Sequence, residues 1–180
     1  QKFFFFFLAG SIQVECLNSR ATEFRVKIEK HSFLSREIPV TGEIREVVNE
    51  GFVFHGREYK ATCLTVGNPH CIIFADQVSE EAVRELGPYV ENAPEFPERM
   101  NLQICRRIDS GNLDMEIWER GSGYTKASGT GSCAAAIAAR RLGLVDERVN
   151  VNQPGGMIQI DLKEDGEVYM TGSVGFVGEI

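Results

Sequence analysis

The sequence predicts an α+β domain in which mostly antiparallel strands are wrapped around one central helix. Two observations lead to this prediction. Segments 12–16 and 24–28 alternate apolar and polar residues with a period of two, which is typical of strands with one buried face, and further strand-like segments follow along the chain. Residues 133–142 are instead rich in alanine, the best helix former, and follow a run of glycine and serine. Because small side chains allow close contact on every side, we expect this helix to be buried.

The first thirty residues indicate an antiparallel hairpin with one solvent-facing side. Segments 12–16 and 24–28 both alternate apolar with polar residues, and residues 18–20 supply a turn. We interpret the phenylalanine run at 3–7 as a further, buried strand. A signal-peptide core is the alternative, but the run is short and no clear cleavage signal follows it.

Residues 60–74 predict two strands joined by the turn Gly67-Asn68-Pro69-His70, after a connector and a strand region at 47–54. A second helix is expected over residues 79–91. Ser79 is a good N-cap, acidic residues follow it, and apolar residues recur at helical spacing. Gly87-Pro88 is expected to interrupt this helix.

The second half of the chain continues the pattern of strands around a helix. Residues 100–108 and 113–118 predict a hairpin. The Ala-rich helix is expected to begin near Thr130 and ends in two arginines, where the helix dipole favours cations. Further strands are expected at 149–151, 157–162 and 168–170.

Charge and composition exclude several classes of protein. The 180 residues include 26 acidic and 19 basic side chains, a net charge of −7, which argues against a nucleic-acid partner and favours a small-molecule or protein partner. No apolar run approaches the roughly 20 residues that span a bilayer, so no membrane partner is expected. The five cysteines form no C-x-x-C pair, which predicts neither a disulfide framework nor a metal site and fits a cytoplasmic protein.

Two of the strand ends could carry chemistry. Asn68 and His70 lie on a tight turn, where the histidine could act as an acid or base; a surface histidine in an ordinary turn is the alternative. Glu119 and Arg120 follow an apolar strand and could bind the ammonium and carboxylate groups of an amino acid. A surface ion pair of little energetic value is the alternative there.

The start of the Ala-rich helix, residues 128–132, could bind an anion. Its first backbone N–H groups are unpaired, the helix dipole is positive there, and glycines allow close approach. The segment lacks the lysine of a nucleotide phosphate loop and is not a dinucleotide fingerprint. An ordinary serine cap is the alternative. Asn101, an amide where a strand would otherwise be apolar, supports no prediction by itself.

Four motifs, in this order and spacing, resemble the diaminopimelate epimerase family. They are Gly67-Asn68-Pro69-His70, residues 96–101, residues 118–135 with Glu119-Arg120-Gly121 and Ser128-Gly129-Thr130-Gly131, and Gln153-Pro154-Gly155-Gly156. The resemblance runs from about Ser11 to the C-terminus.

The resemblance implies a fold of two similar lobes, each with strands around a central helix, and an active site between the lobes. It implies chemistry without a metal or a pyridoxal cofactor, and conversion of LL- to meso-diaminopimelate, a precursor of lysine and of the cell wall. In that family two cysteines face each other across the α-carbon of the substrate. One thiolate removes the proton and the other thiol delivers one to the opposite face.

Residue roles follow from the same resemblance. The amides of Gly129 and Thr130 would bind the α-carboxylate, and His70 and Glu119 would support acid–base chemistry. The distal end of the amino-acid substrate would be held by Asn68, Asn101, Glu119 and Arg120.

The chain departs from the family at one catalytic position. Ser128 stands where the family has its second catalytic cysteine, and Cys133, five residues on and inside the helix, does not replace it. A serine hydroxyl is a far weaker acid than a thiol, so two-base chemistry is expected to be altered or lost at Ser128.

The resemblance also begins after the opening third of the family pattern. Residues 31–170 are therefore expected to form the C-terminal lobe, and residues 1–30 and 171–180 to be remnant strands of the N-terminal lobe. The missing lobe is then an expected partner, a homodimer is an option, and the chain alone is expected to be inactive. Two alternatives stay open: a one-base isomerase or dehydratase of the same fold, and a non-catalytic amino-acid-binding relative.

Overall fold

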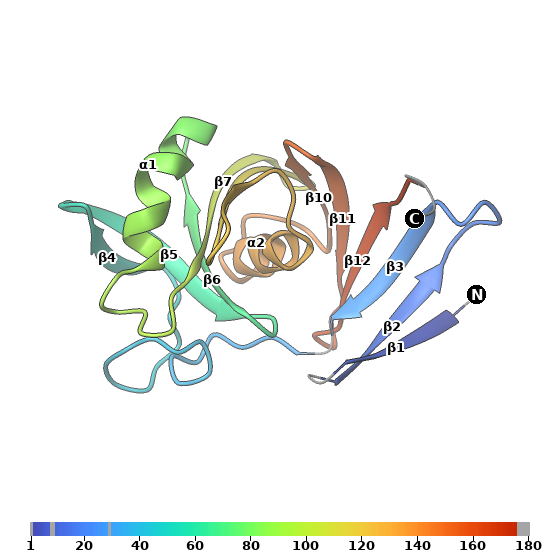
Figure 1. Ribbon diagram of the computed structural model, residues 1–180, viewed down its shortest axis with the longest axis horizontal. Helices are drawn as coiled ribbons and strands as arrows, with labels where there is room; N and C mark the ends of the chain where they lie inside the picture. The colour runs from blue at the N-terminus through green and yellow to red at the C-terminus, as the bar shows by residue number, and fades with distance from the viewer. Residues whose placement is uncertain (1, 8–9, 29, 176–180) are drawn as a thin grey trace.

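The computed structural model describes residues 2–7, 10–28 and 30–175 (Figure 1). The helices are α1 (Glu80–Glu91) and α2 (Gly129–Arg141). The strands are β1 (Lys2–Phe7), β2 (Gly10–Cys16), β3 (Glu23–Ile28), β4 (Glu50–Phe54), β5 (Arg57–Thr65), β6 (Pro69–Phe74), β7 (Asn101–Asp109), β8 (Asn112–Glu119), β9 (Gly123–Thr125), β10 (Arg148–Gln153), β11 (Gly156–Leu162) and β12 (Val168–Ser173). Within the described residues, neither helix has the length and apolar character needed to cross a membrane.

All the strands belong to one twelve-stranded sheet. Its order is β1-β2-β3-β12-β11-β10-β8-β7-β6-β5-β4, and β9 pairs with β8. Neighbouring strands are antiparallel except for the parallel pairs β6–β7 and β8–β10. Parallel neighbours need a long crossover connection, and α1 and α2 provide the two crossovers. The prediction of an α+β fold with mostly antiparallel strands is confirmed.

Helix α2 forms where the Ala-rich run predicted a helix. Ser128 caps its first turn, alanines fill its middle, and Arg140 and Arg141 lie in its last turn. Residues 131–139 are all buried. The helix contacts β5 to β8 and also β10 to β12 (Figure 1). Strands can approach it this closely because its alanine side chains are a single carbon long.

Helix α1 confirms the predicted segment but not the predicted interruption. Ser79 is its N-cap, and the helix continues through Gly87-Pro88 to Glu91. Pro88 removes one helical hydrogen bond, and its side chain is exposed. Gly87 lies against Trp118, and an added Cβ would come within 2.3 Å of the indole. Glycine here therefore serves close packing rather than a break.

The part of the sheet from β4 to β8 has a different core on each face. Ile72 of β6 and Cys105 of β7 join α2 in one cluster, whereas Ile73 and Ile104 of the same strands join α1 in the other. Successive side chains along a strand alternate between faces. Residues 70, 101 and 103 therefore belong to the α2 face.

The strands β1 to β3 and β12 form the end of the sheet opposite α1 (Figure 1). The predicted hairpin is confirmed, with Val14 opposite Val26 and Cys16 opposite Phe24. The phenylalanine run belongs to β1, paired with β2. We predicted that the phenylalanine side chains of this run are buried. The side chains of residues 4–7 lie outside the described ones, and Phe3 is exposed.

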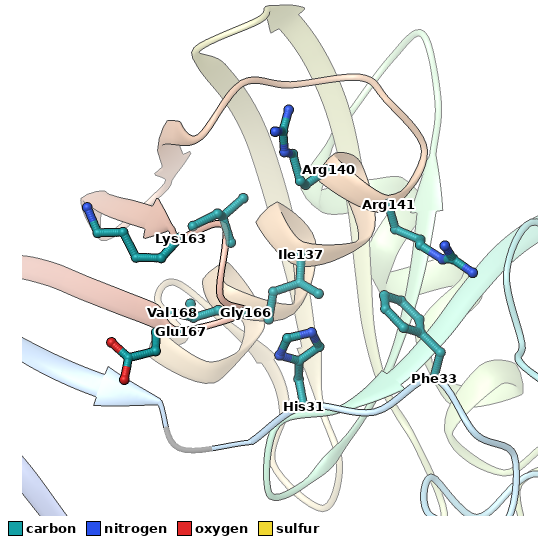
Figure 2. A pocket seen from close by; sticks show the side chains of 10 residues that line it. His31, Phe33, Ile137, Arg140, Arg141, Lys163, Gly166, Glu167 and Val168 are labelled. Carbon is teal, nitrogen blue, oxygen red and sulfur yellow. The ribbon is translucent and has the colours of Figure 1, made fainter.

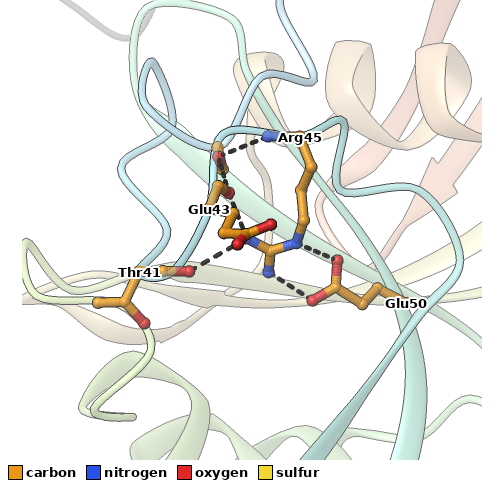
Figure 3. A network of polar contacts seen from close by, with 5 residues as sticks. Thr41, Glu43, Arg45 and Glu50 are labelled. Carbon is orange, nitrogen blue, oxygen red and sulfur yellow. Dashed lines mark hydrogen bonds and ion pairs between the residues drawn. The ribbon is translucent and has the colours of Figure 1, made fainter.

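A connector between β3 and β4 is held by Arg45 (Figure 3). Its guanidinium donates to both carboxylate oxygens of Glu50 and to the carbonyls of Thr41 and Glu43. One strand, β9, was not predicted, because its three residues lie in the Gly/Ser-rich segment before α2.

Candidate active site

The predicted site residues come from strand ends that the sheet brings to one edge. His70 of β6 lies directly opposite Asn101 of β7 in the parallel pair. Because β7 and β8 are antiparallel, the start of β7 lies beside the end of β8, where Glu119 stands. Asn68 is in the turn that leads into β6, and Ser128 begins α2. Residues far apart in sequence thus lie near one another.

His70 is a buried residue, and the alternative of a surface histidine is wrong. Its side chain is 0% exposed. Nδ1 lies 2.9 Å from Oε1 of Gln103, and Nε2 lies 3.0 Å from Oδ1 of Asn68. Burial, together with the positive charge of Arg120, lowers the pKa of His70 to about 4. The imidazole is therefore neutral at neutral pH.

Asn68 connects the strand ends with the start of α2. Besides its contact with His70, its Nδ2 lies 3.5 Å from the hydroxyl of Thr130 in the first turn of α2. A chain of polar contacts therefore runs from Gln103 through His70 and Asn68 to Thr130.

Asn101 forms hydrogen bonds with the backbone of two neighbouring segments. Its Nδ2 donates to the carbonyl of Pro69 at 2.7 Å, and its Oδ1 accepts from the backbone N–H of Arg120 at 2.8 Å. The amide that supported no prediction by itself thus ties the turn before β6 to the segment after β8.

Glu119 and Arg120 do not form the surface ion pair considered as the alternative; no ion pair joins them within the described part of the chain. The guanidinium of Arg120 donates to the carbonyl of Glu98 at 2.8 Å. Both side chains are partly buried.

A carboxylate that the sequence did not single out holds this segment in place. Glu91, at the end of α1 and only 7% exposed, accepts from the indole of Trp118 at 2.7 Å, from the N–H of Gly121 at 2.8 Å and from Arg99 at 3.0 Å. The donors satisfy the buried charge. Glu91 thereby contacts the residues on both sides of Glu119 and Arg120, the side chain of Trp118 and the backbone of Gly121.

Ser128 is the N-cap of α2, as the capping alternative predicted. Its Oγ accepts from the N–H of Gly131 at 3.1 Å, and its own N–H donates to Oε1 of Gln153 at 2.9 Å. The N–H groups of Gly129 and Thr130 have no hydrogen-bond partner among the described residues. Unpaired donors and a positive dipole end are the features that accommodate an anion.

Close packing leaves no room for side chains at the glycines of this turn. A Cβ on Gly129 would lie 2.9 Å from the sulfur of Met170. A Cβ on Gly131 would lie 2.9 Å from Oγ of Ser128 and 3.1 Å from Nε2 of Gln103. Met170 and Gly129 also line a hollow of about 310 Å³ between the start of α2 and β12.

Cys133 is buried one turn into α2, away from solvent. Burial raises the pKa of its thiol to about 12. The thiol therefore stays protonated at neutral pH and supplies no thiolate.

A second hollow, of about 360 Å³, lies at the other end of α2 (Figure 2). Its lining includes His31, Phe33, Arg140, Arg141 and Lys163, and it contains none of the predicted site residues. The described residues contain no group of three or more His, Cys, Asp or Glu side chains arranged to hold a metal ion.

Gln103, Gln153 and Glu91 were not predicted as part of the site. For Gln103 a signal existed, because it lies two residues after Asn101 on a strand that is otherwise apolar up to Cys105. Gln153 belongs to a quoted motif but had no role assigned to it. Glu91 gave no signal, since an acidic residue on an amphipathic helix is ordinarily solvent-exposed.

The fold is shared with solved racemases and epimerases of small amino acids. A hydroxyproline epimerase from Agrobacterium vitis superposes with a TM-score of 0.70 at 11% identity, and a probable proline racemase from Agrobacterium radiobacter with 0.69 at 14%. Each comparison covers 99% of this chain and 58% of the other. At such low identity the likeness concerns the fold alone.

Sequence comparison identifies the family. The family model described as diaminopimelate epimerase matches residues 62–177, and the chain belongs to this family. "Diaminopimelate epimerase 2" of Nostoc sp. is 42% identical over 166 residues, which is 92% of this chain and 58% of the relative. The diaminopimelate epimerase of Moorella thermoacetica is 36% identical over 168 residues, 92% of this chain and 60% of the relative. The chain thus spans about three fifths of the length of these relatives.

Proposed function

We propose that this chain provides the substrate-binding C-terminal lobe of a cofactor-independent epimerase that interconverts LL- and meso-diaminopimelate. The observation that best supports the proposal is the polar chain from Gln103 through His70 and Asn68 to Thr130. It joins the strand ends to the start of α2, where the N–H groups of Gly129 and Thr130 have no hydrogen-bond partner among the described residues. This is the arrangement needed to hold an amino acid beside an acid–base group.

In this proposal the α-carboxylate binds to the N–H groups of Gly129 and Thr130. Removing the α-proton breaks the C–H bond and leaves its electron pair on the α-carbon, from where charge spreads into the carboxylate. Donors fixed at the carboxylate oxygens stabilise that charge. Return of a proton to the opposite face of the carbon completes the inversion.

The distal end of the substrate is assigned to the other strand ends. Arg120 pairs with the distal carboxylate and Glu119 with the distal ammonium, while Asn68 and Asn101 complete the hydrogen bonds. This assignment suits a substrate with an amino-acid group at each end. His70 and Glu119 support proton transfer in it.

The proposed division into lobes follows the sheet. We assign residues 31–170 to the C-terminal lobe, with its strands wrapped around α2. Residues 1–30 and 171–180 are assigned to the other lobe, supported by the pairing of β3 with β12; residues 176–180 lie outside the described part. The other lobe supplies the opposing acid–base group and is the partner needed for turnover.

Ser128 favours a second function, binding of the amino acid without inversion. A hydroxyl is a much weaker acid than a thiol, and this one already accepts a hydrogen bond from Gly131. The chain alone is then expected to bind substrate without exchanging its α-hydrogen.

Binding is tested by titrating the ¹⁵N-labelled chain with diaminopimelate and recording amide chemical shifts. We expect the amides of Gly129, Thr130 and Gly131 to move most, and Arg120→Lys to weaken binding about tenfold or more. Lysine, which lacks the second carboxylate, is the matched control ligand and should bind more weakly. Shifts confined to other residues, or the absence of binding at millimolar concentration, would contradict the proposal.

Catalysis is tested by α-hydrogen exchange in deuterated water. We expect no exchange above buffer for this chain and none for Ser128→Cys alone, because the second base is on the other lobe. Exchange that depends on His70 would show that one lobe suffices.

A further inference from the structure

Gln103 is a polar residue in a place that packing alone does not explain. It lies near the start of β7 on the face toward α2, and its side chain is 0% exposed. Its Oε1 is 2.9 Å from Nδ1 of His70, but its Nε2 has no hydrogen-bond partner among the residues that the structure describes. A buried donor without a partner is destabilising. A residue that only filled this space would be better replaced by an apolar side chain.

The direction of the hydrogen bond determines where the proton of His70 lies. A carboxamide oxygen can only accept, so with Gln103 placed as in the structure Nδ1 carries the hydrogen that faces its Oε1. The Oδ1 of Asn68 faces Nε2 in the structure, but burial keeps the ring neutral with a single hydrogen. In this protonation pattern Nε2 has a lone pair, and it accepts from Asn68 once that carboxamide is turned with its NH₂ inward. The hydroxyl of Thr130 permits this turn, since a hydroxyl both donates and accepts.

The free NH₂ of Gln103 is directed toward the start of α2. A Cβ added to Gly131, in the first turn of α2, would lie 3.1 Å from Nε2 of Gln103 and 2.9 Å from Oγ of Ser128. The NH₂ group of Gln103 and the hydroxyl of Ser128 therefore both lie next to Gly131. One carboxamide thus contacts the imidazole at one end and faces the helix entrance at the other.

We propose that Gln103 is a positioning residue that fixes the Nδ1–H form of His70 and so presents the Nε2 lone pair toward Asn68 and the helix entrance. The importance of this role for catalysis rests on the proposed function, whereas the protonation pattern itself does not. The charged group that acts on the ring is Arg120. The neighbouring strand β5 faces it with Leu64, and α2 with the uncharged Thr130.

The first test is nitrogen NMR of the chain labelled with ¹⁵N-histidine, which has three histidines to resolve. In the wild-type chain at neutral pH we expect His70 to carry its proton on Nδ1. In Gln103→Met, which fills the same space without an acceptor, we expect the proton to move to Nε2, facing Asn68, while the free energy of unfolding stays near the wild-type value. An unchanged tautomer in this variant would overturn the proposal.

The matched control is Gln153→Met, the same change at a buried glutamine that contacts Ser128 rather than His70. We expect it to leave the His70 tautomer unchanged. A change of tautomer in both variants would mean that the ring responds to any disturbance near α2, which would also overturn the proposal.

A second variant, Gln103→Glu, keeps the shape and adds a charge. A carboxylate at hydrogen-bond distance favours the imidazolium, so we expect the proton affinity of His70 to rise about tenfold or more. A pH titration of the ring nitrogens measures this. An unchanged titration would show that residue 103 does not control the ring. Neither test uses a substrate, so failure here is distinct from failure of diaminopimelate binding.

Discussion

The two ends of α2 differ in their charged side chains and in the hydrogen-bond partners of their polar groups. At its start, the first turn contains no acidic residue, Ser128 is buried, and the N–H groups of Gly129 and Thr130 have no hydrogen-bond partner in the described part of the chain. At its end, Arg140 and Arg141 neutralise the dipole, are partly exposed and face Glu147 and Glu46. The cationic side chains at the end of the helix thus offset its dipole, whereas the first turn has no acidic side chain that would do so at the start.

The difference also explains why the hollow at the end of α2 is the less suitable site. Its lining mixes the long cationic side chains of Arg140, Arg141 and Lys163 with apolar ones (Figure 2). The start of α2 offers rigid backbone donors and a buried imidazole. Catalysis depends on donors fixed in place before the ligand arrives.

The largest effect we expect is a pH dependence that comes from the start of α2. The pKa of His70 is about 4 in the folded chain against 6.5 in the unfolded chain. Between these values only the unfolded chain binds the proton, so stability falls as the pH drops from about 6.5 to about 4, by about 3 kcal/mol from this group. Urea unfolding across this range measures it.

Substituting His70 and His31 one at a time shows which end of α2 the pH dependence of stability comes from. His70→Asn should remove most of this slope. His31→Asn, in the hollow at the end of α2, should remove little, because His31 is only partly buried although burial lowers its pKa too. If both variants reduced the pH dependence of the free energy of unfolding equally, the two ends of α2 would not differ in this respect.

The second effect concerns packing at the start of α2. Gly131→Val would push a side chain into Ser128 and Gln103, and we expect it to destabilise the fold by about 2 kcal/mol. Gly143→Ala, just beyond the end of α2, meets no atom within 4 Å, although its φ of +70° adds strain. Denaturant unfolding should show a smaller loss, about 1 kcal/mol, for Gly143→Ala.

A third effect is the loss of the cap. Ser128→Ala removes the acceptor for the N–H of Gly131 and should cost about 1 kcal/mol of stability. Ser128→Asp, which can still cap, should retain most of it. If alanine were as stable as serine, the capping role of Ser128 would be wrong.

The smallest effect is expected at the end of the helix. Arg141→Ala removes an exposed ion pair with Glu46 and the contact of the guanidinium with Phe33. We expect a loss below about 1 kcal/mol that shrinks further at high salt. A larger loss than that of Ser128→Ala would reverse the contrast between the two ends.

Local patterns were sufficient to predict most elements. The alternation at 12–16 and 24–28 and the alanines of 133–142 gave the hairpin and α2. The prediction that Gly87-Pro88 interrupts α1 was wrong. It relied on the rule that glycine and proline disfavour the interior of a helix. The rule failed because Pro88 faces solvent and Gly87 makes room for Trp118, which are facts of packing.

The sequence by itself determined which residue types the chain offers for an amino-acid site, because the motifs around Asn68, Glu119 and Ser128 are local. Only the tertiary structure decided how they are connected. Gln103 contacts His70, Glu91 holds the segment after β8, and Asn68 reaches Thr130. These pairs are up to 62 residues apart in the chain. Contacts of that kind are set by strand register and by the faces to which side chains point, which no short pattern encodes.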